Sequence, residues 1–166
     1  MRVFTSSLIA SVFFASTAIA QGAAVPFGPQ ADTSLPVEVT AESLDVRQDD
    51  GTAEFIGDVV VIQGVMKLSA DRVKVNYDES ASRISSMDAS GNVILVNGPD
   101  AAEADEAEYS VDTGLVVLTG NVLMTQGPNA LASERATINL VDGTARMAGR
   151  VKTILLPAST EEDQQN

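Results

Sequence analysis

The chain has 166 residues, enough for one domain with a single hydrophobic core. It contains no cysteine, histidine or tryptophan, which excludes a disulfide framework, a Cys or His catalytic group and the usual zinc ligands. Its net charge of −13 excludes general nucleic-acid binding, yet 45% of its residues are apolar, as in a folded domain.

The first twenty residues have the pattern of a cleaved signal peptide. Arg2 is the only charged residue before Asp32, residues 8–19 are largely apolar, and Ala18-Ile19-Ala20 is a small-x-small cleavage site. An uncleaved leader that anchors the chain in a membrane is the alternative. Export of a cysteine-free chain suits an oxidising compartment, so the sequence indicates the bacterial cell envelope.

Two further segments flank the expected domain, which covers residues 36–156. Residues 21–35 are rich in Ala, Gly and Pro and are predicted to form a flexible lead-in. Residues 157–166 are predicted to form a disordered acidic tail.

Three segments within the domain repeat in one register. They read TAEFIGDVVVIQGVMKLSADRVKVNY from Thr52, MDASGNVILVNGPDAAEADEAEYSV from Met87, and LVVLTGNVLMTQGPNALASERATINL from Leu115. Each has a glycine followed by Asp or Asn and then Val, a second glycine after Gln or Asn, and an acidic residue further on. Parts of further units precede and follow them. The chain is therefore built from stacked supersecondary units.

Each unit is predicted to be two β-strands joined at the second glycine. Around the first glycine every second residue is apolar or glycine, which indicates a strand with one face turned inward. The apolar positions change parity at Asp71-Arg72, as at a β-bulge. Residues 100–109 are rich in Ala and acids, but the repeat places them in a strand too. The inward positions are Phe55, Val59, Val61, Val73, Val75, Met87, Val93, Leu95, Tyr109, Leu118, Val122, Met124 and Ile138.

Units of this size share their apolar faces by stacking. The inner faces then either close into a packed core or leave an apolar trough, and the residue types suit both outcomes. Both ends are strand-like and carry no polar cap, so they invite a further strand from a second copy or a partner. Val37 and Val39 mark one such edge, and Val151 and Ile154 mark the other.

These residues resemble the LptA/OstA-like family of periplasmic lipopolysaccharide-transport proteins. The resemblance covers residues 36–156 and rests on the leader, the PVEVTAESLDV opening, the FIGDVVVIQGVMKLSADRVKVNY segment and the recurring GNV strands. It implies an all-β, twisted open β-jellyroll whose interior holds the acyl chains of lipopolysaccharide. The inward residues above would then line a lipid-binding groove.

The resemblance also implies partners. Related domains would join edge to edge into a bridge between the membranes, through an inner-membrane anchored protein, an outer-membrane receptor protein or a second copy of the chain. No cofactor, metal or catalytic residue is expected, and no Gly-rich phosphate-binding loop is present.

Three alternatives stay open at this point. An enzyme would have to use paired carboxylates, for which Glu42, Asp71, Asp105 and Glu134 are the candidates, although their recurrence beside a bulge favours backbone capping. A structural β-repeat module with a filled core is the second. A membrane-anchored partner or a receptor domain of the same transport system is the third.

Overall fold

The computed structural model describes residues 24–47, 51–78, 80 and 83–155. The predicted signal peptide and the predicted acidic tail lie outside these residues. Within them the only regular elements are β-strands, and no helix is long and apolar enough to cross a membrane. The strands are β1 (Val25–Pro26), β2 (Glu38–Thr40), β3 (Ser43–Arg47), β4 (Thr52–Gln63), β5 (Met66–Tyr77), β6 (Ile84–Asn97), β7 (Asp100–Ser110), β8 (Leu115–Gln126), β9 (Asn129–Asn139), β10 (Thr144–Ala148) and β11 (Lys152–Ile154).

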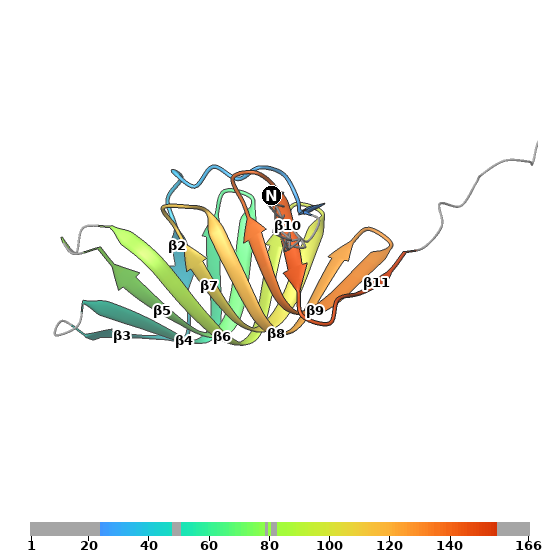
Figure 1. Ribbon diagram of the computed structural model, residues 1–166. Helices are drawn as coiled ribbons and strands as arrows, with labels where there is room; N and C mark the ends of the chain where they lie inside the picture. The colour runs from blue at the N-terminus through green and yellow to red at the C-terminus, as the bar shows by residue number, and fades with distance from the viewer. Residues whose placement is uncertain (1–23, 48–50, 79, 81–82, 156–166) are drawn as a thin grey trace, which may run out of the picture.

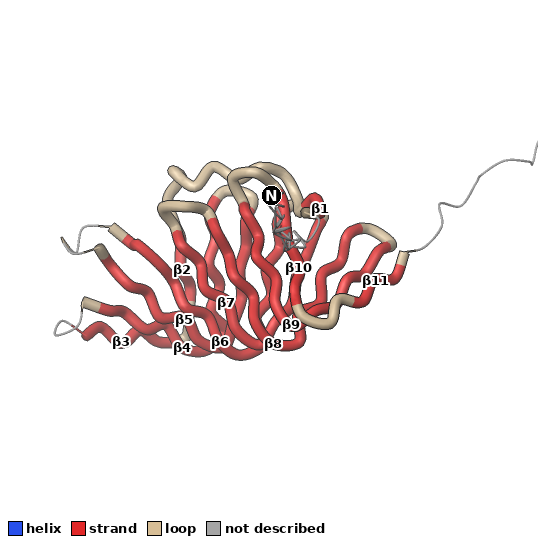
Figure 2. Tube along the Cα trace, viewed as in Figure 1, coloured by secondary structure: helices blue, strands red, loops and turns tan. Residues whose placement is uncertain are grey.

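All eleven strands belong to one antiparallel sheet (Figures 1 and 2). Nine of them follow the order β1-β10-β9-β8-β7-β6-β5-β4-β2, while β11 also pairs with β9 and β3 also pairs with β4. Neighbours in space are neighbours in the chain from β4 to β10, as expected for stacked hairpins. Residues 100–110 form a regular strand despite their alanine and acid content. The predicted all-β jellyroll of stacked antiparallel hairpins is confirmed.

A line of bulges folds this sheet in two. The pairing register shifts between Ile56 and Val59, and equivalent shifts occur in every pair of long strands up to β8 and β9. Each shift includes a Gly-Asp or Gly-Asn pair with positive φ, as at Gly91 (77°) and Asn92 (47°), a conformation that suits these residue types. The bend turns each strand into two halves on opposite sides of a V (Figure 1). The predicted change of parity at Asp71-Arg72 is confirmed.

We call the two sides of the V layer A and layer B. Layer A holds residues 59–70, 93–104 and 122–133, each of which is a hairpin that turns at the second glycine of its unit, together with β2 and β11. Layer B holds residues 52–57, 72–77, 84–91, 106–120 and 134–148, together with β3.

Two short strands finish the sheet at each end. At the first end β2 and β3 both pair with β4, and at the second end β10 and β11 both pair with β9. Among the described residues no further strand pairs with β2 or β3, so the first end is uncapped, as predicted. At the second end β1 adds two residues to the edge of β10, while β11 has no further strand beyond it among the described residues.

The predicted flexible lead-in is wrong for residues 24–35. We call residues 24–37 the strap, because they cross the open side of the V from β10 to β2 (Figures 1 and 2). Phe27 is fully buried in the core, and Phe27 N donates to Gly143 O at 2.9 Å. Burial of the Phe27 side chain in the apolar interior stabilises this segment more than its Pro and Gly residues favour a flexible one.

Candidate functional site

The inward side chains form continuous rows across the strands. In layer B one row runs through cross-strand partners from Val75 to Ala145, and in layer A another runs from Val61 to Leu131. The layer B row is Val75, Met87, Tyr109, Val116, Ile138 and Ala145. The layer A row is Val61, Leu68, Leu95, Ala102, Met124 and Leu131. The apolar lining therefore extends along the whole length of the V.

The two layers pack against each other in this structure. Of the thirteen predicted groove residues, twelve are at most 3% exposed and belong to one buried cluster, while Phe55 is half-buried beside it. Side chains thus fill the interior, which is the closed outcome of the two left open by the sequence. All thirteen side chains lie where the period predicted, and their contact with lipid stays a prediction.

Sequence reasoning missed several members of this interior. Phe27 is the largest of them, and Met66 is also less than 2% exposed. Phe27 had a signal, because Phe27 and Phe55 are the only phenylalanines beyond the leader. Because Phe27 lies in a Pro- and Gly-rich segment, it was assigned to the lead-in and not to the interior.

A hydrogen bond joins the two layers through the interior. Tyr109 of layer B donates its hydroxyl to Gln63 Oε1 of layer A at 2.5 Å, and both side chains are buried. Burial raises the pKa of Tyr109 to about 12, because the tyrosinate would lack water. Gln63 also donates Nε2 to the carbonyls of Thr33 and Leu35, so it links both layers and the strap.

One hollow lies where the interior reaches the surface beside β2. It has a volume of about 530 Å³ and is lined by residues 33–37 of the strap with Gln63, Arg83, Ile84, Val111 and Asp112. Val37, Ile84 and Val111 are half-buried and pack against the core. This mouth is thus partly apolar and partly charged.

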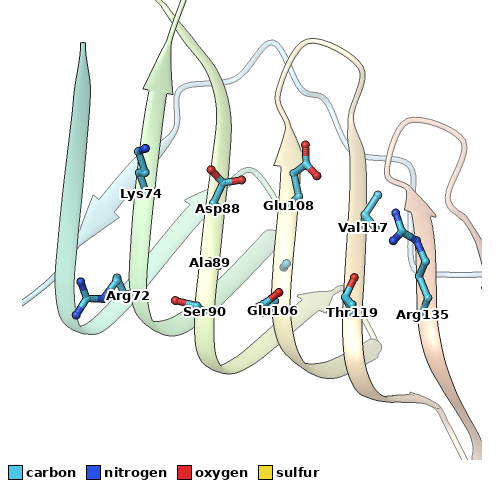
Figure 3. A pocket seen from close by; sticks show the side chains of 11 residues that line it. Arg72, Lys74, Asp88, Ala89, Ser90, Glu106, Glu108, Val117, Thr119 and Arg135 are labelled. Atoms are coloured by element: carbon cyan, nitrogen blue, oxygen red, sulfur yellow. The ribbon is translucent and has the colours of Figure 1, made fainter. Parts of the chain in front are cut away.

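A second hollow, of about 400 Å³, lies on the outer face of the sheet (Figure 3). Lys74, Asp88 and Glu108 lie side by side on β5, β6 and β7, and Arg72 and Arg135 lie at its two sides. Arg72 donates to Glu54 at 2.7 Å, and this bond lowers the pKa of Glu54. These cations therefore lie outside the apolar interior.

The recurring acids serve the bends. Glu42, Asp71, Asp105 and Glu134 each lie against the glycine of a bulge, so close that a Cβ on Gly91 would be 2.4 Å from Asp71 Oδ2. Asn92 and Asn121 donate to Asp71 and Asp105, both at 2.9 Å. Glu42 and Asp71 line one hollow of about 520 Å³ on the bend together with Asp58, whereas Asp105 and Glu134 lie against later bulge glycines and outside this hollow. Among the described residues no three acidic side chains gather closely enough to hold a metal ion.

The predicted edge residues lie at the two ends of the sheet. Val39 is in β2 opposite Val61, and Ile154 is in β11 opposite Ala130. Val37 and Val151 adjoin these strands without belonging to them. Leu44 and Val46, which the repeat predicts to be inward, were not among the predicted edge residues, yet they are 51% and 64% exposed on β3 at the first end.

This geometry defines a class of protein. Among the described residues it is a β-jellyroll with an apolar interior, end strands that each leave one edge unpaired, and no assembled catalytic group. The family model described as LptA/(LptD N-terminal domain) LPS transport protein matches residues 38–144. The chain belongs to this family, whose members are non-enzymatic transport proteins.

Individual curated proteins also match this chain. Lipopolysaccharide export system protein LptA of Escherichia coli K12 is 27% identical over 126 residues, which are 72% of this chain and 67% of the relative. An uncharacterized protein of Rhizobium meliloti is 26% identical over 106 residues, so the match covers 63% of this chain and only 57% of that protein.

A solved structure has the same fold. It is that of LptH, described as the LptA homologous periplasmic component of the lipopolysaccharide transport device of Pseudomonas aeruginosa. The TM-score is 0.69 at 21% identity, covering 76% of this chain and 99% of LptH.

Proposed function

We propose that this protein carries lipopolysaccharide through the periplasm and shields its acyl chains in the interior of the V. The observation that supports this most is the pair of unbroken apolar rows, one in each layer, within a chain of the transport family. Each methylene exposed to water costs about 0.8 kcal/mol, so a twelve-carbon chain costs on the order of 10 kcal/mol. A continuous lining offsets this cost at every position along the path.

The lining is also even, which suits transport. Val, Met and Ala occur in both rows, Leu recurs in the layer A row, and few polar groups interrupt either row. A single site of much stronger binding would hold the lipid in place, whereas aliphatic contacts of similar strength along the path let it move. The cations Arg72, Lys74 and Arg135 lie on the outer face, so phosphates of the headgroup would stay in solvent.

The sheet ends support a second part of the proposal. β2 and β3 at one end and β11 at the other present backbone groups and exposed apolar side chains to a further strand. We infer that an inner-membrane anchored protein and an outer-membrane receptor protein with related domains dock there, and that copies of this chain join by the same contact. The rows of one domain would then continue into the next.

Photo-crosslinking tests the carrier role. A photoreactive residue at Val93 or Leu118, both inward and buried, should capture lipopolysaccharide in cells. Asn92, an exposed residue at the bend, is the control. Capture at Asn92 without capture at Val93 or Leu118 would overturn the proposal.

The packed interior supports a second candidate, a structural β-repeat module of the cell envelope. Its side chains already fill the space that acyl chains would need. Absence of capture at all three positions, with a soluble folded protein, would favour this candidate.

A further inference from the structure

Three amide side chains occupy the same place in three successive repeats. Gln63, Asn97 and Gln126 each precede the glycine of a hairpin turn at the rim of layer A. We call these three residues the amide rim. Gln63 and Asn97 are at most 3% exposed, so their polar groups require partners within the protein.

The amide rim binds backbone carbonyls of the strap. Asn97 Nδ2 donates to Phe27 O at 3.1 Å and to Pro29 O at 2.9 Å. Gln63 Nε2 donates to Thr33 O at 2.8 Å and to Leu35 O at 2.9 Å, and Gln126 Nε2 donates to Pro26 O. Every amide thus has the same kind of ligand, the carbonyl of a segment that crosses the strand ends.

The strap also binds layer B. Phe27 N donates to Gly143 O at 2.9 Å, and Ala31 N donates to Leu140 O at 2.8 Å. The strap therefore ties the rims of the two layers together along the open side of the V, where it runs as the blue trace over the sheet (Figure 1). Separation of the layers requires these bonds to break.

Phe27 occupies part of the interior itself. Its ring is fully buried within the same cluster as the predicted groove residues. An acyl chain and this ring would compete for the same apolar space.

Several features make the strap easy to release. β1 pairs over only two residues, and one of them, Pro26, has no N–H to donate. Asn97 Oδ1 is buried without a hydrogen-bond partner among the described residues, which penalises the bound state. Pro29, Gln30 and Ser34 are exposed to solvent.

We propose that the amide rim is a binding site for the carbonyls of an extended peptide segment, that the strap is its resident ligand, and that acyl chains displace the strap when they enter the interior. The inference rests on the proposed carrier function. The strap then keeps the interior closed when no cargo is present.

A reversible covalent lock tests the displacement. Pro26 and Thr144 are cross-strand partners. The adjacent pair, Phe27 and Gly143, is hydrogen-bonded, so Pro26 and Thr144 form a non-hydrogen-bonded pair. Side chains are closer together in such pairs, which suits a disulfide. The chain has no native cysteine, so Pro26→Cys with Thr144→Cys forms one defined disulfide. With a photoreactive residue at Val93, capture of purified lipopolysaccharide should fall about tenfold in the oxidised protein and return on reduction.

The outcomes separate the two proposals. Equal capture in the oxidised and reduced states overturns the strap proposal and leaves the carrier function standing. Absence of capture in both states and in the unlocked protein overturns the carrier function and, with it, displacement by lipid. The comparison uses one protein in two redox states, so a folding defect cannot imitate the expected result.

A second pair of variants tests the resident ligand without a disulfide. Gly28 has φ of 64°, and a Cβ there would lie 2.2 Å from Asn97 O, so Gly28→Val should prevent the strap from docking. Hydrogen exchange at Phe27 and Ala31 should become fast in this variant and, on adding lipopolysaccharide, in the unsubstituted protein. Gln30→Ala, at an exposed strap position, is the control. Slow exchange that lipopolysaccharide does not change, while Val93 captures it, would overturn the proposal.

Discussion

Asn92 donates its side-chain amide to Asp71 Oδ2 at 2.9 Å, across the bend between β5 and β6. Asn121 makes the same bond to Asp105 one repeat later, and in the final unit Arg150 binds Glu134. The donor follows the bulge glycine each time and has positive φ. A side-chain bond therefore accompanies each of these sharp bends.

The first repeat lacks this donor. Asp58 occupies the position of Asn92, with φ of 43°, and lines the same hollow as Glu42. Asp58→Asn should supply the missing donor to Glu42 and raise the free energy of unfolding by about 0.5–1.5 kcal/mol. Thermal unfolding followed by circular dichroism would measure it. The reverse change, Asn92→Asp, should lower stability, and a lower midpoint for Asp58→Asn would contradict the argument.

Leu118→Ala tests whether the interior is packed in solution. Leu118 is fully buried, so its truncation should lower the free energy of unfolding by about 2–5 kcal/mol. Leu123 faces outward and is 37% exposed, so Leu123→Ala is the matched control and should lower the free energy of unfolding much less. Denaturant titration gives both values. Equal losses would indicate that the layers stand apart without cargo.

Tyr109 should make the fold sensitive to alkali. Its pKa is raised from 10.0 to about 12, so the stabilisation is complete below pH 10 and is lost as the pH rises toward 12. Stability measured from pH 9 to 12 should therefore fall more steeply in the unsubstituted protein than in Tyr109→Phe. At neutral pH the same variant should lose about 1–3 kcal/mol, because Gln63 Oε1 is left unpaired. Identical pH profiles would show that Tyr109 ionises without a penalty.

Charges at the sheet ends should block association between copies. Ile154→Lys on β11 and Leu44→Lys on β3 place a charge at side chains that are 52% and 51% exposed, so both variants should fold. Light scattering at increasing concentration should show smaller assemblies for both. Leu123→Lys, in the middle of the sheet, is the control. Unchanged association in the end variants would place the contact elsewhere.

The periodicity of the sequence was sufficient to predict the strands, the bend and the inward side chains. Alternation of two residues sets which face each side chain takes, and repeated glycines fix the register, as for Val93 and Leu118. The sequence did not decide whether the interior is closed or open, because the same aliphatic residues can line a trough or fill a core. The packing of Phe27 and the partners of Gln63 and Asn97 depend on contacts between segments about 30 to 70 residues apart. A local pattern carries no signal for such contacts.

The repeat fixes one dimension of the sheet and leaves another free. In each unit the same number of residues separates the bulge glycine from the turn glycine, as in Gly91 to Gly98 and Gly120 to Gly127. Layer A therefore has a constant depth. Inserting or deleting a complete hairpin would lengthen or shorten the protein while its cross-section stayed the same. The length of the domain and the width of its interior can therefore evolve separately.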